Sequence, residues 1–237
     1  MEMLVRIWVT LKKAKYQGQM QQYKAFSKAM KLPEQMERVY GDGLGRVGGA
    51  KVKYKKVGSG GRASSIQRIT DKSIEKVNKI KFSNLTNDLK IQEYHKMLLK
   101  SARDNNRSLE TAYILNEDYS IKDIVYGDES SINLSGFGNS YLVLHNHPNN
   151  TEHSLQDIQW LCTNRVKGIS VAKNSGECSL LIKTKDFSES QVKIELLRLK
   201  KKYQKDIDTD IEKGYTKVVR DFLKEAKLSK CGLNLLR

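Results

Sequence analysis

The sequence predicts an α/β protein in which a mixed β-sheet is flanked by helices. Segments with strand-like and helix-like patterns alternate between residues 87 and 187, as they do when helices pack on a sheet. Two apolar runs at 168–172 and 178–183 flank the turn-forming residues Asn174-Ser175-Gly176, which predicts a β-hairpin. Residues 188–228 keep a helical apolar spacing, which predicts a long C-terminal helix.

Residues 1–86 predict a basic extension before the core. A helix is expected at 3–31, ended by Pro33, and the Gly-, Lys- and Ser-rich segment 40–65 is expected to be a flexible linker. Residues 43–48 of this linker match the pattern GxGxxG. Because no apolar strand precedes the match and no βαβ unit follows it, we do not expect a dinucleotide site there.

Residues 87–187 predict the elements of the core. The expected helix at 87–104 has its inner side formed by Leu89, Tyr94, Met97, Leu98 and Ala102. Strands are then expected at 111–115, 121–126 and 141–145, followed by a helix at 155–166 and the hairpin. The last domain, residues 188–237, is expected to be a helical segment that packs on its own core or forms an oligomer through the long helix.

Charge is distributed unevenly along the 237 residues, which have a formal net charge of +16. Residues 1–90 carry 20 Lys and Arg against 7 Asp and Glu, 91–187 carry 10 against 12, and 188–237 carry 13 against 8. A basic arm of this kind favours nucleic acid or an acidic protein surface as a partner of residues 1–86. A solvated lysine-rich surface explains the same composition equally well.

The composition also restricts where the protein is expected to work. No apolar run approaches the roughly 18 residues that a membrane span needs. The apolar start is followed by lysines without a small-residue cleavage site, so we expect no signal peptide. The three cysteines are an odd number without metal or redox spacing, as is typical of a reducing compartment. We therefore expect a cytoplasmic protein.

The segment from His145 to Asp157 carries the clearest chemical signal. His145 and His147 end an apolar strand-like run, and residues two apart in a strand point to the same side. Ser154-x-x-Asp157 then opens a predicted helix, which can deliver Asp157 as a third ligand. Two imidazoles and one carboxylate around an open fourth position are typical of catalytic zinc sites. The segment therefore predicts a zinc hydrolase.

Simpler explanations exist for each part of the motif. Ser154 and Asp157 also form a good capping box at a helix N-terminus, and a His-x-His pair alone is more often a surface feature than a metal site. His153 is expected to be a surface residue or a neighbour of the ligands, and His95 to be structural. An HNH nuclease is not favoured, because the residues of that motif are spread over a ββα unit. The ordered combination, after an apolar strand and with Pro148, favours metal binding.

The ordered motif resembles that of the JAMM (MPN-type) metallopeptidases. The family has an upstream Glu, then His-x-His-Pro, a spacer and Ser-x-x-Asp. Here His145, His147, Pro148, Ser154 and Asp157 match. The Asn between the histidines and a spacer one residue shorter than usual resemble the RadC-like, phage- and mobile-element-associated branch. The resemblance covers about residues 88–186 and implies a cytidine-deaminase-like core, located in a bacterial host cell or a virion.

The resemblance also implies roles for individual residues. Zinc is expected on His145, His147 and Asp157, with Ser154 as donor to the oxyanion of a peptide or isopeptide substrate. A Glu just before a neighbouring strand acts as general base in the family. Glu110 fits this place best, and Glu117 and Glu129 are the alternatives.

Two other functions remain open from the sequence. One is a structural or nucleic-acid-associated phage protein, in the head or in packaging, that uses the fold without proteolysis; the basic residues 1–90 favour it. The other is a protease toxin or anti-phage effector that acts on a host protein. Fold and motif alone do not establish proteolysis, because a fold can keep its shape after its activity has changed.

Overall fold

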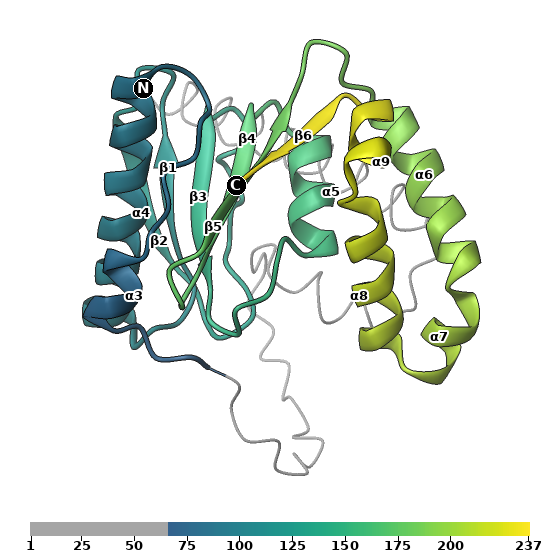
Figure 1. Ribbon diagram of the computed structural model, residues 1–237, viewed down its shortest axis with the longest axis horizontal. Helices are drawn as coiled ribbons and strands as arrows, with labels where there is room; N and C mark the ends of the chain where they lie inside the picture. The colour runs from purple at the N-terminus through teal and green to yellow at the C-terminus, as the bar shows by residue number, and fades with distance from the viewer. Residues whose placement is uncertain (1–65) are drawn as a thin grey trace, which may run out of the picture. The chain divides into compact units, whose positions relative to one another are not determined.

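The computed structural model describes residues 66–237, and the predicted helix 3–31, the linker and the GxGxxG match lie outside this range. A mixed sheet has the strand order β2-β1-β3-β4-β5-β6 (Figure 1). Its strands are β1 (Thr111–Leu115), β2 (Ile121–Tyr126), β3 (Leu142–His147), β4 (Gly168–Lys173), β5 (Cys178–Lys183) and β6 (Leu233–Leu236). β3 and β4 are parallel, and the other neighbours are antiparallel. The predicted α/β class with a mixed sheet and flanking helices is confirmed.

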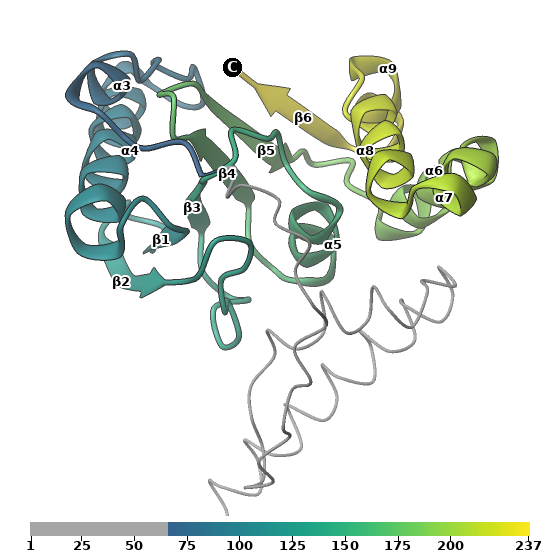
Figure 2. The same ribbon diagram turned by 90° about the horizontal axis from the view of Figure 1, so that it is seen from below.

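Helices cover both faces of this sheet. The short helix α3 (Asp71–Glu75) and the long helix α4 (Leu85–Asn106) lie on one face, and α5 (Leu155–Thr163) lies on the other (Figures 1 and 2). β3 is buried along its whole length, as expected for a central strand covered on both faces. Successive side chains of β3 therefore alternate between the α4 face and the α5 face.

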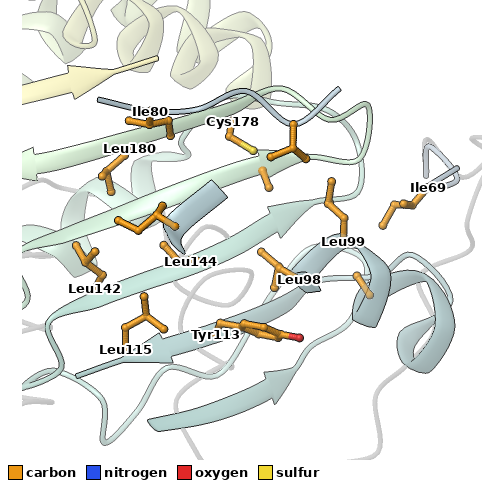
Figure 3. Packing of buried hydrophobic residues seen from close by; sticks show 14 residues of the cluster. Ile69, Ile80, Leu98, Leu99, Tyr113, Leu115, Leu142, Leu144, Cys178 and Leu180 are labelled. Carbon is orange, nitrogen blue, oxygen red and sulfur yellow. The ribbon is translucent and has the colours of Figure 1, made fainter. Parts of the chain in front are cut away.

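The core on the α4 face joins residues from the helix and from several strands. Leu98 and Leu99 of α4 belong to the same buried cluster as Leu142 and Leu144 of β3 (Figure 3). The helix begins at Asn84, whose side chain accepts a hydrogen bond from the Asn87 backbone N–H, which is the preferred arrangement for a helix N-cap. Burial of these apolar side chains fixes α4 across the strands that lead to the predicted metal site.

The inner face of α4 differs in part from the predicted one. Leu98 and Ala102 are buried as expected, but Leu89 and Met97 are exposed. Ile91 and His95 are buried instead. The helix has apolar residues on more than one side, so spacing alone did not determine which side faces the sheet.

Segments on both sides of residues 87–187 contribute to the core. Ile69, Val77 and Ile80 lie in the same buried cluster as the strands (Figure 3). At the other end, β6 pairs with β5 in antiparallel orientation, from Leu236 opposite Leu180 to Leu233 opposite Lys183. The sheet therefore uses residues well outside the segment with the metal motif.

The prediction of one long helix over residues 188–228 is wrong. The region contains α6 (Glu189–Lys202), α7 (Gln204–Thr209), α8 (Ile211–Phe222) and α9 (Glu225–Lys230). The backbone of Asp210 is extended, and its side chain caps α8 by accepting from the Lys213 N–H. Lys224 is also extended. The apolar spacing continues across these breaks because each short helix has its own buried face, and oligomer formation through this region stays a prediction.

Candidate metal centre

His145 and His147 lie on β3, which continues through both residues rather than ending at 145. They project to the same face of the sheet, and both are buried, with 1% and 5% of their surface exposed. The two Nε2 atoms are 3.0 Å apart. The rings meet edge to face, with centroids separated by 4.8 Å. The strand thus presents two imidazole nitrogens to one point in space, as the sequence predicted.

Asp157 approaches these histidines from the first turn of α5. Its Oδ1 lies 3.3 Å from Nε2 of His145, and its Oδ2 lies 3.4 Å from Nε2 of His147. Each of the three residues offers one ligand atom, and these atoms all lie within 4.8 Å of one another. Among the described residues this is the one group of three or more His, Cys, Asp or Glu side chains arranged to hold a metal ion. The structure therefore brings together the three predicted ligands.

The distances within this group can be compared with those of a metal site. Zinc binds nitrogen and oxygen ligands at about 2.0–2.1 Å, so neighbouring ligand atoms of a tetrahedron are about 3.3–3.4 Å apart. The two Nε2 atoms are 3.0 Å apart, and they face different oxygens of Asp157, Oδ1 at 3.3 Å from His145 and Oδ2 at 3.4 Å from His147. The three side chains would hold one metal ion if the carboxylate turned so that a single oxygen faced both Nε2 atoms.

Thr151 determines which ring nitrogen carries the proton when His147 is neutral. The backbone carbonyl oxygen of Thr151 is 3.2 Å from Nδ1 of His147, and the Thr151 hydroxyl oxygen, Oγ1, is 3.0 Å from the same nitrogen. The Thr151 hydroxyl gives its own proton to Oδ1 of Asn149. Both Thr151 oxygens therefore act as acceptors here, so Nδ1 of His147 carries the proton. Nε2 then presents a lone pair to the cluster, as a metal ligand must.

His145 has a different environment. Its Nδ1 is buried and has no hydrogen-bond partner in the described part of the chain. Its Nε2 faces His147 and Asp157. A buried polar atom without a partner costs free energy, so His145 keeps this position at some cost to stability. The Nδ1 atoms of His95 and His153 also have no partner among the described residues, so this feature does not by itself mark a metal ligand.

The charges of the cluster are strongly coupled. Burial would raise the pKa of Asp157, but His145 and His147 outweigh this effect and hold it well below the usual range. Burial acts to lower the pKa of His147, while Asp157, Glu110 and Thr151 together raise it. A metal ligand must be unprotonated at the atom that binds the metal, so a metal ion and a proton on Nε2 of His147 would compete for the same place.

Glu110 lies beside this cluster, directly before β1. The β1–β3 register pairs Ala112 with His145, and its continuation places Glu110 opposite His147. Only 7% of the Glu110 surface is exposed. Burial raises the pKa of Glu110 to about 8, with His147 lowering it and Asp157 raising it further. A buried carboxyl group with a raised pKa is suited to transfer protons near neutral pH.

The alternative glutamates are placed differently. Glu117 follows the other end of β1, and Glu129 lies in the loop after β2; both are exposed. Neither side chain is among those that influence the pKa values of the ligands. Of the three candidates, Glu110 is the one that the structure places at the cluster.

Ser154 forms the capping box that the sequence indicated. Its Oγ accepts a hydrogen bond from the Asp157 N–H at 3.1 Å and donates to Oδ2 of Asp157 at 2.8 Å. The Asp157 carboxylate also accepts from the Ser154 N–H at 2.7 Å. Ser154 therefore orients the carboxylate ligand in this structure. To donate to an oxyanion, the Ser154 hydroxyl would have to give up its hydrogen bond to Asp157.

The other two histidines lie outside the cluster. His153 is buried, so a surface position is wrong for it; its Nε2 donates to the Ile169 carbonyl at 3.0 Å. His95 of α4 is also buried, and its Nε2 is 2.7 Å from Oγ of Ser170. Burial lowers the pKa of each to about 4. Both therefore remain neutral near pH 7, and each uses its Nε2 in a structural contact.

Fold and site together define an α/β protein with a buried His-His-Asp group beside a buried glutamate. Comparisons of the chain with protein-family models, with curated proteins and with solved structures find no match. Within residues 66–237, no helix combines the length and apolarity needed to cross a membrane. Sequence reasoning missed Thr151, because a threonine in the spacer gives no signal until its carbonyl is seen to face His147.

Proposed function

We propose that this protein is a zinc-dependent metallopeptidase that hydrolyses a peptide or isopeptide bond and is encoded by a phage or mobile element. The observation that carries the proposal is that one ligand atom from each of His145, His147 and Asp157 lies within 4.8 Å of the other two. The buried Glu110 beside them supports a hydrolytic site over a purely structural one. The resemblance of the motif to that of JAMM metallopeptidases points to amide hydrolysis as the reaction.

Each residue of the site has a separate role in the proposed reaction. When bound, zinc lowers the pKa of a coordinated water toward about 7 and polarises the substrate carbonyl. Glu110 accepts a proton from the attacking water and returns it to the leaving amine. Thr151 accepts from Nδ1 of His147, so the neutral ring presents its Nε2 lone pair, and Ser154 holds Asp157 in place. A protein or peptide is the expected substrate, because the proposed reaction is the hydrolysis of a peptide or isopeptide bond.

Metal analysis of the full-length protein tests this proposal. We expect about one zinc ion per chain in the wild type and none in His147→Ala or Asp157→Ala. Glu152→Ala is the matched control, because this carboxylate pairs with Lys173 at 3.0 Å and does not belong to the ligand group. Absence of zinc from the wild type after zinc addition, or equal zinc in all four proteins, would refute the site.

Glu110→Gln tests the hydrolytic step separately. The change removes the basic carboxylate but leaves the three ligands intact, so zinc content should be unchanged. Cleavage of a labelled unfolded protein such as casein should fall by about 100-fold or more, as expected when a general base is lost. A zinc-loaded variant that cleaves as fast as the wild type would exclude Glu110 as the base.

Nucleic-acid association is a second candidate function, favoured by the 20 basic against 7 acidic residues within 1–90. Counterion release predicts that DNA affinity falls steeply with salt. The truncation that tests this should remove residues 1–65 only, because Ile69, Val77 and Ile80 are part of the core. DNA binding that is insensitive to salt, or unchanged by this truncation, would exclude the basic extension as the binding segment.

A further inference from the structure

The residue between the two histidines has a role of its own in the geometry of the site. Asn146 is completely buried, and alternation along β3 sends its side chain to the sheet face opposite that of His145 and His147. The β1–β3 ladder ends at the pair Ala112–His145. Beyond it, the Thr111 N–H donates to Oδ1 of Asn146 at 2.7 Å. A side-chain amide thus replaces the strand ladder where the two strands reach the site.

The same amide contacts the chain on the other side of Glu110. Nδ2 of Asn146 donates to the Leu109 carbonyl at 3.1 Å. One bond therefore holds the peptide group before Glu110, and the other holds the peptide group after it. These two bonds tie the Glu110 backbone to β3, the strand of the histidines, while the same peptide groups also bond to Asn106 and to the loop after β2.

Asn174 determines which way the Asn146 amide points. It is completely buried in the turn between β4 and β5, and its Nδ2 donates to the carbonyls of Gln67 at 2.7 Å and Ser108 at 2.9 Å. Its Oδ1 must then face Asn146, and it accepts from Nδ2 of Asn146 at 2.8 Å. This leaves Oδ1 of Asn146 as acceptor for the N–H of Thr111. The contacts of Asn174 thus fix the orientation of its own amide, and this in turn fixes the orientation of the Asn146 amide.

We propose that Asn146 is a positioning residue for Glu110, acting through the peptide groups on either side of it, with Asn174 holding its amide in register. The inference rests on the proposed function, in which Glu110 acts beside a metal held by His145 and His147. It explains why an amide stands between the histidines, since this position needs a donor and an acceptor together. Aspartate would set an oxygen against the Leu109 carbonyl, and leucine would leave buried polar groups unpaired.

The test measures how zinc-loaded full-length protein binds acetohydroxamate, a chelator of zinc that also donates a hydrogen bond to a neighbouring carboxylate. Asn146→Ala should weaken acetohydroxamate binding about 10-fold, in the range seen when a residue that orients site groups is removed. Zinc affinity should stay within about 3-fold, since the three ligands are unchanged. Asn174→Ala should weaken acetohydroxamate binding less, by about 3-fold, because both bonds around Glu110 remain possible.

A matched control comes from a similar amide elsewhere in the fold. Asn78 accepts from the Cys178 N–H at 2.7 Å and donates to the Cys178 carbonyl at 3.1 Å. Asn78→Ala therefore removes the same kind of bond pair away from the metal ligands. We expect it to lower the unfolding midpoint but to leave acetohydroxamate binding unchanged.

The decisive comparison repeats Asn146→Ala in a Glu110→Gln background. If Asn146 acts through Glu110, its 10-fold effect on acetohydroxamate binding disappears there, because coupled residues are not additive. A 10-fold loss in both backgrounds, or in Asn78→Ala as well, would overturn the positioning role while leaving the metallopeptidase proposal intact. Wild-type protein that binds no zinc would overturn both. If Asn146→Ala does not fold, Asn174→Ala in the two backgrounds decides the question by the same criterion.

Discussion

Asp221 is expected to be the most sensitive charged residue of the C-terminal helices. Only 3% of its surface is exposed, and its carboxylate lies 2.8 Å from the ammonium groups of Lys202 and Lys224. It lies 3.3 Å from that of Lys227 and accepts from the Tyr203 hydroxyl at 3.0 Å. One side chain on α8 thus joins the end of α6 to the start of α9.

The cost of Asp221→Asn can be estimated from these contacts. The lysines at 202 and 224 are more than half exposed, so each pair contributes less than about 1 kcal/mol. Lys227 is only 17% exposed, and the bond from Tyr203 to a charged acceptor contributes about 1.5–3 kcal/mol. Because asparagine keeps one acceptor oxygen, we expect a loss of about 2–3 kcal/mol in unfolding free energy. This corresponds to about 4–12 °C in the unfolding midpoint of a domain of this size.

The pH dependence gives the same prediction a second test. Lys202 and Lys224 hold the pKa of Asp221 well below its usual range, whereas in the unfolded chain it is about 3.9. The stabilisation is therefore complete above about pH 4 and is lost as the pH falls toward the folded pKa. Thermal unfolding should therefore show the full difference between wild type and Asp221→Asn at pH 7 and a smaller one at pH 3, which lies between the unfolded and the folded pKa.

Asp208→Asn provides the control, since this exposed carboxylate accepts only from the Gln204 side chain among the bonds described. Its unfolding midpoint should match that of the wild type within about 2 °C, as is usual for surface changes. An Asp221→Asn midpoint equal to the wild type at pH 7, or an equal deficit at both pH values, would contradict the assigned role of the carboxylate.

The remaining predictions concern the metal site and the hairpin beside it. Zinc at about 100 times its dissociation constant should raise the wild-type unfolding free energy by about 2.7 kcal/mol; differential scanning fluorimetry should show no such rise in Asp157→Ala, and an equal rise would place the metal elsewhere. Thr151→Val should weaken zinc binding about 10-fold in a competition titration with a chelator, because the acceptor hydroxyl at Nδ1 of His147 is lost; unchanged affinity would show that the Thr151 carbonyl suffices. Gly176→Ala should destabilise the fold by about 1–3 kcal/mol in urea unfolding, because φ is +103° and a Cβ would overlap the Ser73 carbonyl; a wild-type midpoint would contradict this.

The sequence predicted the local elements of the core well. The strands 111–115 and 121–126 match β1 and β2 to the residue, and the hairpin strands match β4 and β5. These segments combine apolar runs with clear turn residues at their ends, so local preference and tertiary structure agree. The helix at 87–104 differs from α4 by only two residues at each end, which is the usual uncertainty of helix boundaries.

Tertiary contacts account for what the sequence did not indicate. β6 has only four residues, and its strand character depends on the edge of β5. His153 is buried because its imidazole reaches the Ile169 carbonyl, and no local pattern reports a contact across 16 residues. In the site, the spacing of the motif predicted the group His145, His147 and Asp157, and the resemblance to the JAMM motif pointed to Glu110. It could not predict the amides that connect them, because Asn146 and Asn174 meet only when two strand ends lie side by side.

The pairing of β6 with β5 has a consequence for how the chain is made. The two strands are neighbours in the sheet, yet residues 184–232 separate them in sequence. At a synthesis rate of about 5–20 residues per second, roughly 50 residues take about 2–10 s. For that time the edge of β5 has no strand to pair with, and an unpaired edge invites association with other chains. Nascent chains that stall within α6 to α9 are therefore expected to be the species most prone to aggregate.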